Sequence, residues 1–265
     1  MSSTLNPRVI DGVNWIGLNT LIKKEVGRFM KVHLQTVWAP VITTVLYYMV
    51  FSLSFAGTGR GVDGVPYLTF LMPGLVMMGI AQNAFANTSS SIIIAKIQGS
   101  IVDVLMPPLT NSELLTGLVV GGLLRGVAVG IASIIVLVPF AHLPIAHVWA
   151  IVAYCLLGST FMSLTGVLAG LWADKFDHLA SVTNFIVMPL TMLSGTFYAA
   201  QNLPAGWIMA AHANPFFYMI DGFRYGFIGV ADMPLATGLT MLSFLCALFW
   251  WACLAVLKSG YKIRS

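Results

Sequence analysis

Side chains that could carry out catalysis are few in this sequence, and they are not grouped. The 5 histidines and 3 cysteines are scattered, and none shows the spacing of a metal or nucleophile motif. The sequence contains no H-E-x-x-H and no G-x-S-x-G. It contains no Gly-Lys dipeptide either, so it lacks the phosphate-binding loop G-x-x-x-x-G-K-[ST]. We therefore expect no catalytic residue, no metal site and no cofactor bound by this chain.

The charged side chain that stands out is Arg125, in the middle of the apolar stretch "GGLLRGVAVG". A charge at membrane depth is costly, so it needs a partner or a function. We favour a structural role, in which the arginine pairs with carbonyl groups or a lipid phosphate, over a direct role in transport. No Asp or Glu lies deep in any long apolar stretch, which argues against a proton- or sodium-coupled transporter.

Two apolar segments carry weakly polar residues at helical spacing. In residues 67–87 and 182–200 these residues recur three or four positions apart, so each set would share one helix face. An interface between helices explains any single residue most simply, and a passage for a transported molecule is the functional alternative. The candidate pathway residues are Met72, Val76, Asn83, Asn184, Met188, Thr191, Ser194, Gly195 and Tyr198.

The stretch "NPFFYMIDGFRYGFIG", residues 214–229, is apolar and aromatic yet contains two charges. With residues 201–213 it forms two apolar pieces, divided at Asn214, that are too short to cross a bilayer. We expect a re-entrant helix pair in the outer leaflet, in which Asp221 and Arg224 are spaced to form an ion pair. The pair could be a plug or an outer gate, and the gate candidates are Asn214, Tyr218, Asp221 and Arg224.

These side chains sit in a sequence that is 58% hydrophobic and only 8% charged, whereas a soluble domain has about 25% charged residues. The class is therefore a membrane protein. A nucleic-acid partner is disfavoured because no basic cluster has polar surroundings. We predict an all-α polytopic fold with six transmembrane helices, since unsatisfied backbone is not tolerated in lipid. The predicted spans are residues 37–55, 67–87, 114–140, 148–173, 182–200 and 235–257.

The basic residues set the predicted orientation. With the N-terminus inside, ten of the 13 Lys and Arg fall in cytoplasmic segments, Arg60 and Arg224 fall outside, and Arg125 lies within a span. The positive-inside rule then places both termini in the cytoplasm. The chain reads as one transmembrane domain, 1–265. It comprises a cytoplasmic tail with an amphipathic helix (1–36), a six-helix membrane core (37–258) and a second cytoplasmic tail (259–265).

A basic amphipathic helix is predicted before the first span, in residues 13–33. Apolar residues from Trp15 to Met30 fall on one face at helical spacing. Such a helix lies flat on the inner leaflet and contacts membrane lipids. A simple lipid anchor and a surface that also binds a cytoplasmic partner both remain open. The basic residues on the polar face are Lys23, Lys24, Arg28 and Lys31.

The connection between the second and third spans is too apolar for a flexible linker. Ile97, Ile101 and Leu105 recur at helical spacing, which predicts a short amphipathic helix that the following Pro-Pro pair ends. Thr110 and Glu113 form a capping box that starts the third span. The helix could be a packed loop or a lever that receives force from a partner.

In order and spacing, several segments together resemble the membrane subunits of type-2 ABC transporters, in particular the YadH-type exporter permeases. They include "KKEVGRFMK", "YLTFLMPGLVMMGIAQNAFAN", "IVDVLMPPLTNSELLTG", "GGLLRGVAVG", "PLTMLSGTFYAAQNLP" and "NPFFYMIDGFRYGFIG". The resemblance runs almost from end to end. It implies a bacterial inner-membrane protein that forms a homodimer above two copies of a separate ATP-binding subunit.

The resemblance also implies roles for the elements. The partner subunit binds ATP and Mg²⁺ and hydrolyses the nucleotide, so this chain is not an enzyme. The basic N-terminal helix would contact the ATPase, the second and fifth spans would flank the pathway, and the segment after the fifth span would be the outer re-entrant pair. The coupling helix between spans two and three would contain Lys96, Gln98, Ile101, Asp103, Leu105, Met106 and Pro107.

The expected function is that of a permease subunit of an ATP-driven ABC exporter. Because the pathway candidates are uncharged, we expect a hydrophobic or amphiphilic substrate, such as a drug, a lipid or a glycolipid. Two alternatives remain: an ion-coupled secondary transporter, and a structural membrane subunit that transports nothing.

Overall fold

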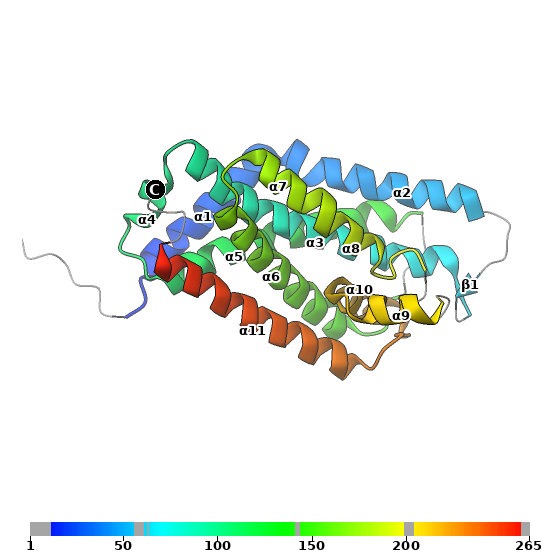
Figure 1. Ribbon diagram of the computed structural model, residues 1–265. Coiled ribbons are helices and arrows are strands. Elements are labelled where there is room, and N and C mark those ends of the chain that lie inside the picture. Colours follow the sequence, from blue (N-terminus) through cyan, green and yellow to red (C-terminus); the bar gives the residue numbers. More distant parts are fainter. Residues whose placement is uncertain (1–11, 56–60, 63, 141–143, 199–203, 261–265) are drawn as a thin grey trace, which may run out of the picture.

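The computed structural model describes residues 12–55, 61–62, 64–140, 144–198 and 204–260, so most of both predicted tails lies outside the described residues. The described chain is a helical bundle with one small antiparallel hairpin, in which Gly61 pairs with Pro66 (Figure 1). In chain order the elements are α1 (Trp15–Lys31), η1 (Leu34–Trp38), α2 (Ala39–Phe55), β1 (Gly61–Val62), β2 (Val65–Pro66), α3 (Tyr67–Ile97), α4 (Ile101–Leu105), α5 (Asn111–Leu137), α6 (Val148–Trp172), α7 (Phe176–Val182), η2 (Thr183–Val187), α8 (Met188–Met192), α9 (Ala205–His212), α10 (Pro215–Ile228) and α11 (Leu235–Ser259).

Among the described residues, five helices are long and apolar enough to cross a membrane. The prediction of an all-helical polytopic membrane protein is confirmed at this level. The five lie at Leu34–Ser54, Tyr67–Ile97, Asn111–Leu137, Val148–Trp172 and Leu235–Ser259. We call the end of the bundle that carries α4 the α4 end, and the opposite end, which carries α9 and α10, the α10 end (Figure 1).

The second predicted span is too short, because α3 continues ten residues beyond Asn87 to Ile97. Ile92 and Ile93 are buried, so the extension packs inside the bundle and does not form a loop. The Ser89 hydroxyl donates to the Phe85 carbonyl one turn earlier at 2.8 Å, which keeps this polar residue compatible with a buried helix.

The fifth predicted span is wrong in its bounds. Continuous helix begins at Phe176 and ends at Met192, through α7, η2 and α8, and residues 193–198 form bends. Gly195 takes a left-handed backbone conformation with φ of 74°, which a helix cannot contain. The helix is 17 residues long, shorter than the roughly 20 residues that a perpendicular span needs.

Two π-helical turns interrupt otherwise α-helical segments, and each lies just before a proline. In η1 the N–H of Ala39 donates to the Leu34 carbonyl, and Pro40 follows. In η2 the N–H of Met188 donates to the Thr183 carbonyl, and Pro189 follows. Proline has no N–H to continue an α-helical ladder, so a wider turn before it adjusts the local hydrogen bonding.

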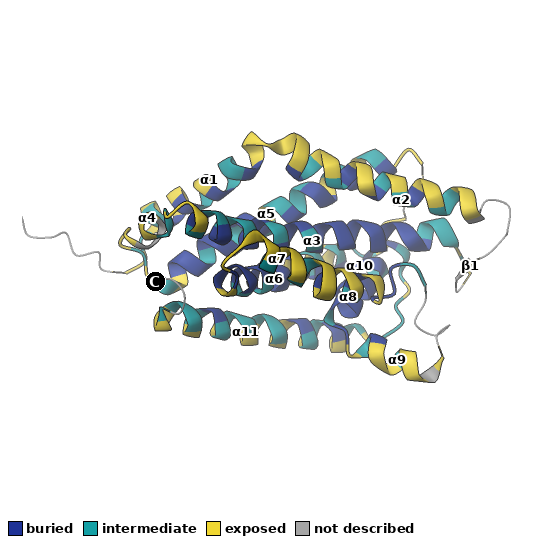
Figure 2. Ribbon diagram, turned by 45° about the horizontal axis from the view of Figure 1, so that its top comes forward, coloured by how far each residue is buried: buried dark blue, intermediate teal, exposed yellow. Residues whose placement is uncertain are grey.

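Helix α3 lies at the centre, between glycine-rich faces of α5 and α6. A Cβ added to Gly126 on α5 would lie 2.9 Å from the Ile80 carbonyl oxygen, and one on Gly170 of α6 would lie 3.0 Å from the Ser89 carbonyl oxygen. The glycines of α5 and α6 therefore form small-residue ridges that let the helix backbones approach closely. Figure 2 shows α3 and α10 largely buried, while α2, α8 and α11 expose much of their surface.

We predict that Gly126→Ala destabilises the chain by about 1–3 kcal/mol, since the methyl group must push α5 away from α3. Gly27→Ala is the matched control. A Cβ at Gly27 on α1 meets nothing within 4 Å, so this change should be neutral or stabilise by up to about 1 kcal/mol. Thermal unfolding of the two purified variants in detergent measures both effects, and equal midpoints would contradict the close packing.

Candidate functional site

A lateral trough floored by α3 runs along the side of the bundle. It consists of two adjoining grooves, of about 290 Å³ and about 370 Å³, that share Gln82, Asn83 and Met188. We call their union the α3 trough. One wall comes from η1 and α2, with Gln35, Ala39, Pro40, Thr43, Thr44 and Tyr47, and the other from α7, η2 and α8, with Phe176, Leu179, Thr183, Val187, Met188 and Met192.

The floor of the α3 trough is polar but uncharged. The Gln82 amide donates to the Thr191 hydroxyl across the trough at 3.4 Å. The Asn83 amide nitrogen donates to the Gly79 carbonyl at 3.0 Å, and its oxygen accepts from the Arg125 Nη2 at 3.0 Å. The favoured structural role for Arg125 therefore has a partner, although it is a side-chain amide and not a carbonyl of the backbone or a lipid phosphate.

The predicted pathway residues do not all reach the trough. Asn83 and Met188 line it. Thr191 is buried, and its hydroxyl accepts a hydrogen bond from the Gln82 amide. Met72 and Val76 are packed inside the core of the chain, because the face of α3 that carries them lies against neighbouring helices. The remaining candidates lie elsewhere: Asn184 is exposed outside the trough lining, Ser194 and Gly195 sit in the buried bend after α8, and Tyr198 lines a separate pocket with Trp207.

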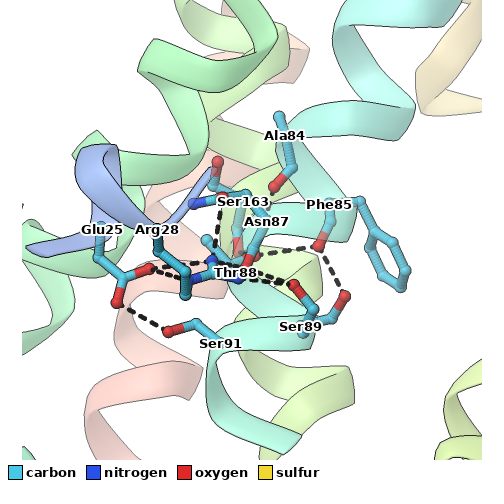
Figure 3. Close-up of polar contacts among 10 residues, drawn as sticks. Glu25, Arg28, Ala84, Phe85, Asn87, Thr88, Ser89, Ser91 and Ser163 are labelled. Atoms are coloured by element: carbon cyan, nitrogen blue, oxygen red, sulfur yellow. Dashed lines mark hydrogen bonds and ion pairs between the residues drawn. The ribbon is translucent and has the colours of Figure 1, made fainter. Parts of the chain in front are cut away.

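The basic helix α1 binds to the bundle through a polar network (Figure 3). Arg28 forms an ion pair with Glu25 at 3.1 Å and donates to the Asn87 carbonyl at 2.7 Å and to the Ser90 hydroxyl at 3.1 Å. The Ser91 hydroxyl donates to the second oxygen of Glu25 at 2.8 Å. This corrects the prediction that Arg28 lies on an outward basic face, because the side chain turns toward α3.

Sequence reasoning missed Glu25, which is 1% exposed. The predicted apolar face of α1 is the one expected to contact lipid, whereas the face that packs on the bundle runs through Leu18, Leu21, Glu25 and Phe29. Trp15, expected on the apolar face, is exposed. The signal that could have found the network is the i, i+3 spacing of an acid and an arginine within one helix.

At the α4 end, hydrogen bonds to the Glu113 carboxylate hold neighbouring segments together. The predicted capping box is confirmed, since the Thr110 N–H donates to Glu113 at 2.7 Å and the Glu113 N–H donates to the Thr110 hydroxyl. Glu113 also accepts from the Asn14 N–H at 2.5 Å, which ties the start of α1 to the start of α5. The starts of α1 and α5 therefore meet at one carboxylate, and the Asn14 amide also donates to the carbonyl of Pro108, in the segment after α4, at 3.1 Å.

The coupling candidates differ in exposure. Lys96 turns inward, because its ammonium donates to the carbonyls of Leu171 and Ala173 at the end of α6, at 2.5 and 3.0 Å. Ile101 is half-buried, and the side chain of Leu105 is not among those described. The exposed members, together with the exposed lysines of α1, are Gln98, Asp103, Met106, Pro107, Lys23, Lys24 and Lys31.

At the α10 end the predicted division at Asn214 is confirmed, since its side chain caps α10 by accepting from the Phe216 N–H. The predicted ion pair is wrong. Asp221 accepts from the N–H groups of Asp232 and Met233, at 2.8 and 3.1 Å. Arg224, on the same helix, binds other groups.

Arg224 is 2% exposed and joins three segments. It donates to the Phe70 carbonyl at 3.2 Å and to the Gly195 carbonyl at 2.6 Å, and its guanidinium lies 3.7 Å from the centre of the Phe70 ring. Tyr218 is also buried, and its hydroxyl donates to the His212 carbonyl at 2.8 Å. All four gate candidates are therefore packed within the described part of the chain.

The fold and the trough define a membrane protein with a lateral groove and no metal cluster among the described residues. A family model described as ABC-2 type transporter matches residues 17–228, so the chain belongs to this family of transport permeases. It is similar to the inner membrane transport permease YadH of Escherichia coli (strain K12), with 38% identity over 255 residues, 95% of this chain and 98% of that protein. Nodulation protein J of Rhizobium leguminosarum bv. viciae is 24% identical over 247 residues, 89% of each chain. The chain is thus a multi-pass inner-membrane permease subunit.

We predict that Arg224→Gln destabilises the chain by about 2–4 kcal/mol, because the carbonyls of Phe70 and Gly195 lose a buried charged donor. Lys31→Gln, which removes the same charge from an exposed position on α1, is the control and should change stability by less than about 0.5 kcal/mol. Thermal unfolding in detergent compares them. Equal stability of the two variants would show that Arg224 does not hold the α10 end together.

Proposed function

We propose that this chain is the permease subunit of an ATP-driven exporter, in which two copies form the pathway above two copies of a separate ATP-binding subunit. The α3 trough supports this proposal, because it places hydrogen-bonding groups in the lateral face of a membrane bundle beside the largely apolar wall of α7, η2 and α8. A groove of this kind suits a molecule that arrives from the bilayer and has both apolar and polar parts.

The proposed topology places the α4 end in the cytoplasm and the α10 end outside, as the distribution of Lys and Arg supports. The helix from Phe176 to Met192 is then the remaining membrane span, the fifth in chain order. The bend that follows it completes the crossing of the membrane. Helices α9 and α10 form the re-entrant pair. The chain is one domain, with residues 1–36 as tail and interfacial helix, 37–258 as membrane core and 259–265 as a cytoplasmic tail.

The proposed homodimer closes the α3 trough with a second copy. The open side of the trough lies between two walls that expose apolar groups, and Met188 and Met192 are 39% and 37% exposed. A second copy facing this side would bury these groups and turn two lateral grooves into one enclosed passage. The uncharged lining supports a hydrophobic or amphiphilic cargo, such as a drug, a lipid or a glycolipid.

The proposed mechanism is alternating access. Closure of the ATP-binding subunits pushes α4, the coupling helix. Asn14, which donates to the Pro108 carbonyl after α4 and to the Glu113 carboxylate, passes the movement to α1 and α5. The network of Glu25 and Arg28 links α1 to α3 at the edge of the trough. The partner subunit supplies ATP, Mg²⁺ and the phosphate chemistry, and this chain supplies the path.

Purification of the tagged chain from native membranes in mild detergent tests the proposal. A co-purifying subunit with a P-loop, in equal amount and with two copies of each chain, is the expected result. A chain that purifies alone would favour the rival functions, an ion-coupled secondary transporter or a subunit that transports nothing.

We predict that Asp103→Lys on α4 lowers the amount of co-purified ATP-binding subunit about tenfold, the effect of losing roughly 1.4 kcal/mol of binding free energy. Asp103 is exposed, so the fold should survive. Asp177→Lys, at another exposed acidic position at the α4 end, is the matched control and should leave co-purification unchanged. Equal losses in both variants would contradict the assignment of α4 as the coupling helix.

We also predict that Met188→Trp lowers export by about tenfold while ATP hydrolysis by the complex continues, because the larger ring fills the point where the two grooves meet. Phe185→Trp, one turn earlier and 81% exposed, lies outside the trough lining and serves as the control. Transport in proteoliposomes at matched ATP hydrolysis rates makes the comparison. Normal export by the Met188 variant would remove the trough from the pathway.

A further inference from the structure

Two guanidinium groups lie directly behind the uncharged floor of the α3 trough. Arg125 donates to the Asn83 side-chain oxygen at 3.0 Å, and Arg28 donates to the Ser90 hydroxyl at 3.1 Å. Asn83 and Ser90 are both lining residues of the trough. The floor is therefore backed by positive charge, although no Lys or Arg itself is among the lining residues.

Only one of these two charges is neutralised. Arg28 pairs with Glu25, the sole ion pair between described residues in the bundle. Arg125 is half-buried, contacts an amide and no carboxylate, and its Nε is a buried donor without an acceptor among the described residues. The other described carboxylates lie at the two ends of the bundle: Asp103, Glu113, Asp174 and Asp177 at the α4 end, and Asp221 and Asp232 at the α10 end.

Arg125 also orients the Asn83 amide. Because the side-chain oxygen faces Arg125, the nitrogen faces the Gly79 carbonyl, and Gly79 lines the same groove. The nitrogen has two hydrogens, and that carbonyl uses one. The Gln82 amide nitrogen is a second donor on the floor. It donates to the Thr191 hydroxyl at 3.4 Å and to the Met188 sulfur at 3.7 Å, long contacts that an anionic acceptor can replace. The floor thus presents N–H donors in front of an uncompensated positive charge, an arrangement that favours a negatively charged acceptor.

The apolar side chains along the trough indicate the chemistry of the rest of the ligand. Beside the polar groups of the floor, the trough is lined by apolar side chains, Met78 and Phe85 of α3 and Leu179, Val187 and Met192 of the wall formed by α7, η2 and α8. A small hydrophilic anion would leave this surface without a partner, whereas an acyl or other hydrocarbon chain would cover it.

We propose that the α3 trough binds amphiphiles whose polar head is anionic, such as a phosphate or carboxylate, and that Arg125 is the residue that sets this preference. This inference rests on the proposed function only in taking the trough as the substrate site. The anionic head lies over Asn83 and Gln82, and the hydrocarbon part lies along the wall of α7, η2 and α8. Zwitterionic and neutral amphiphiles of the same chain length bind more weakly.

The test measures equilibrium binding to the full chain in phosphatidylcholine nanodiscs. Three radiolabelled probes share one acyl chain: lysophosphatidic acid, lysophosphatidylcholine and monoacylglycerol. We expect the anionic probe to bind about tenfold more tightly than the neutral one, and Arg125→Gln to remove this difference by weakening the anionic probe alone. Arg125→Lys should retain most of it, and Lys258→Gln, which removes an exposed charge of α11, should retain all of it.

A second variant tests the same charge without disturbing Arg125. Gln82→Glu places a carboxylate on the accessible floor, so it should weaken the anionic probe and tighten binding of dodecyltrimethylammonium, a cationic amphiphile. Both comparisons use variants with wild-type thermal stability.

Three results would overturn the proposal: equal binding of the three probes by the unaltered chain, equal loss of all probes in Arg125→Gln, or competition by inorganic phosphate as strong as by lysophosphatidic acid. Binding is measured without nucleotide or partner, so it is read independently of whether an ATP-binding subunit co-purifies. A charge preference with no co-purifying subunit would contradict the proposed exporter and leave the anionic site standing.

Discussion

The close packing of α3 between the glycine faces of α5 and α6 is the constraint on which the rest of the structure depends. Where Gly126 and Gly170 face backbone carbonyls, the helices can approach only because no side chain intervenes. Dispersion attraction between closely packed helices holds them together in lipid, where burial of apolar surface offers little. Because α3 packs against helices on two sides, only a narrow stripe of its surface is left to line a groove. That stripe is the floor of the α3 trough.

Charged groups are used in this bundle as connectors between segments. Arg224 ties α10 to the start of α3 and to the bend after α8, and Arg28 ties α1 to the opposite end of α3. Lys96 ties α3 to the end of α6. Each cation donates to backbone carbonyls, and those of Leu171 and Gly195 lie where a helix ends or bends and leaves carbonyls without an intrahelical partner. Arg125 differs, because among the described residues it donates to no backbone carbonyl and its partner is the Asn83 side chain.

The sequence alone could predict most of the long helices and some of their ends, because apolar length and capping residues act locally, although the predicted end of α3 and both predicted bounds of the fifth span are wrong. The capping box at Thr110 and the helix start at Asn214 are examples, and the small-residue ridge of α5 is another. Family resemblance added roles that local patterns do not carry.

What could not be predicted depends on packing. The sequence pattern puts Arg28 on a solvent face with Lys23 and Lys24, whereas a rotation of the helix directs it to Asn87. Asp221 and Arg224 have the spacing of an ion pair, yet each finds nearer partners on segments distant in sequence. Met72 and Val76 share a helical stripe with Asn83. This stripe faces the core at Met72 and Val76 and faces the trough at Asn83.

The length of α3 has a consequence for the membrane itself. Its 31 residues extend about 46 Å at 1.5 Å per residue, whereas the hydrocarbon core of a bilayer is about 30 Å thick. The helix must tilt, project beyond the lipid, or thicken the bilayer around it. Because α5 and α6 are fixed to α3, they cannot tilt independently of it. The tilt of the whole bundle therefore depends on bilayer thickness. Lipids of different chain length would change the angle at which the trough meets each leaflet.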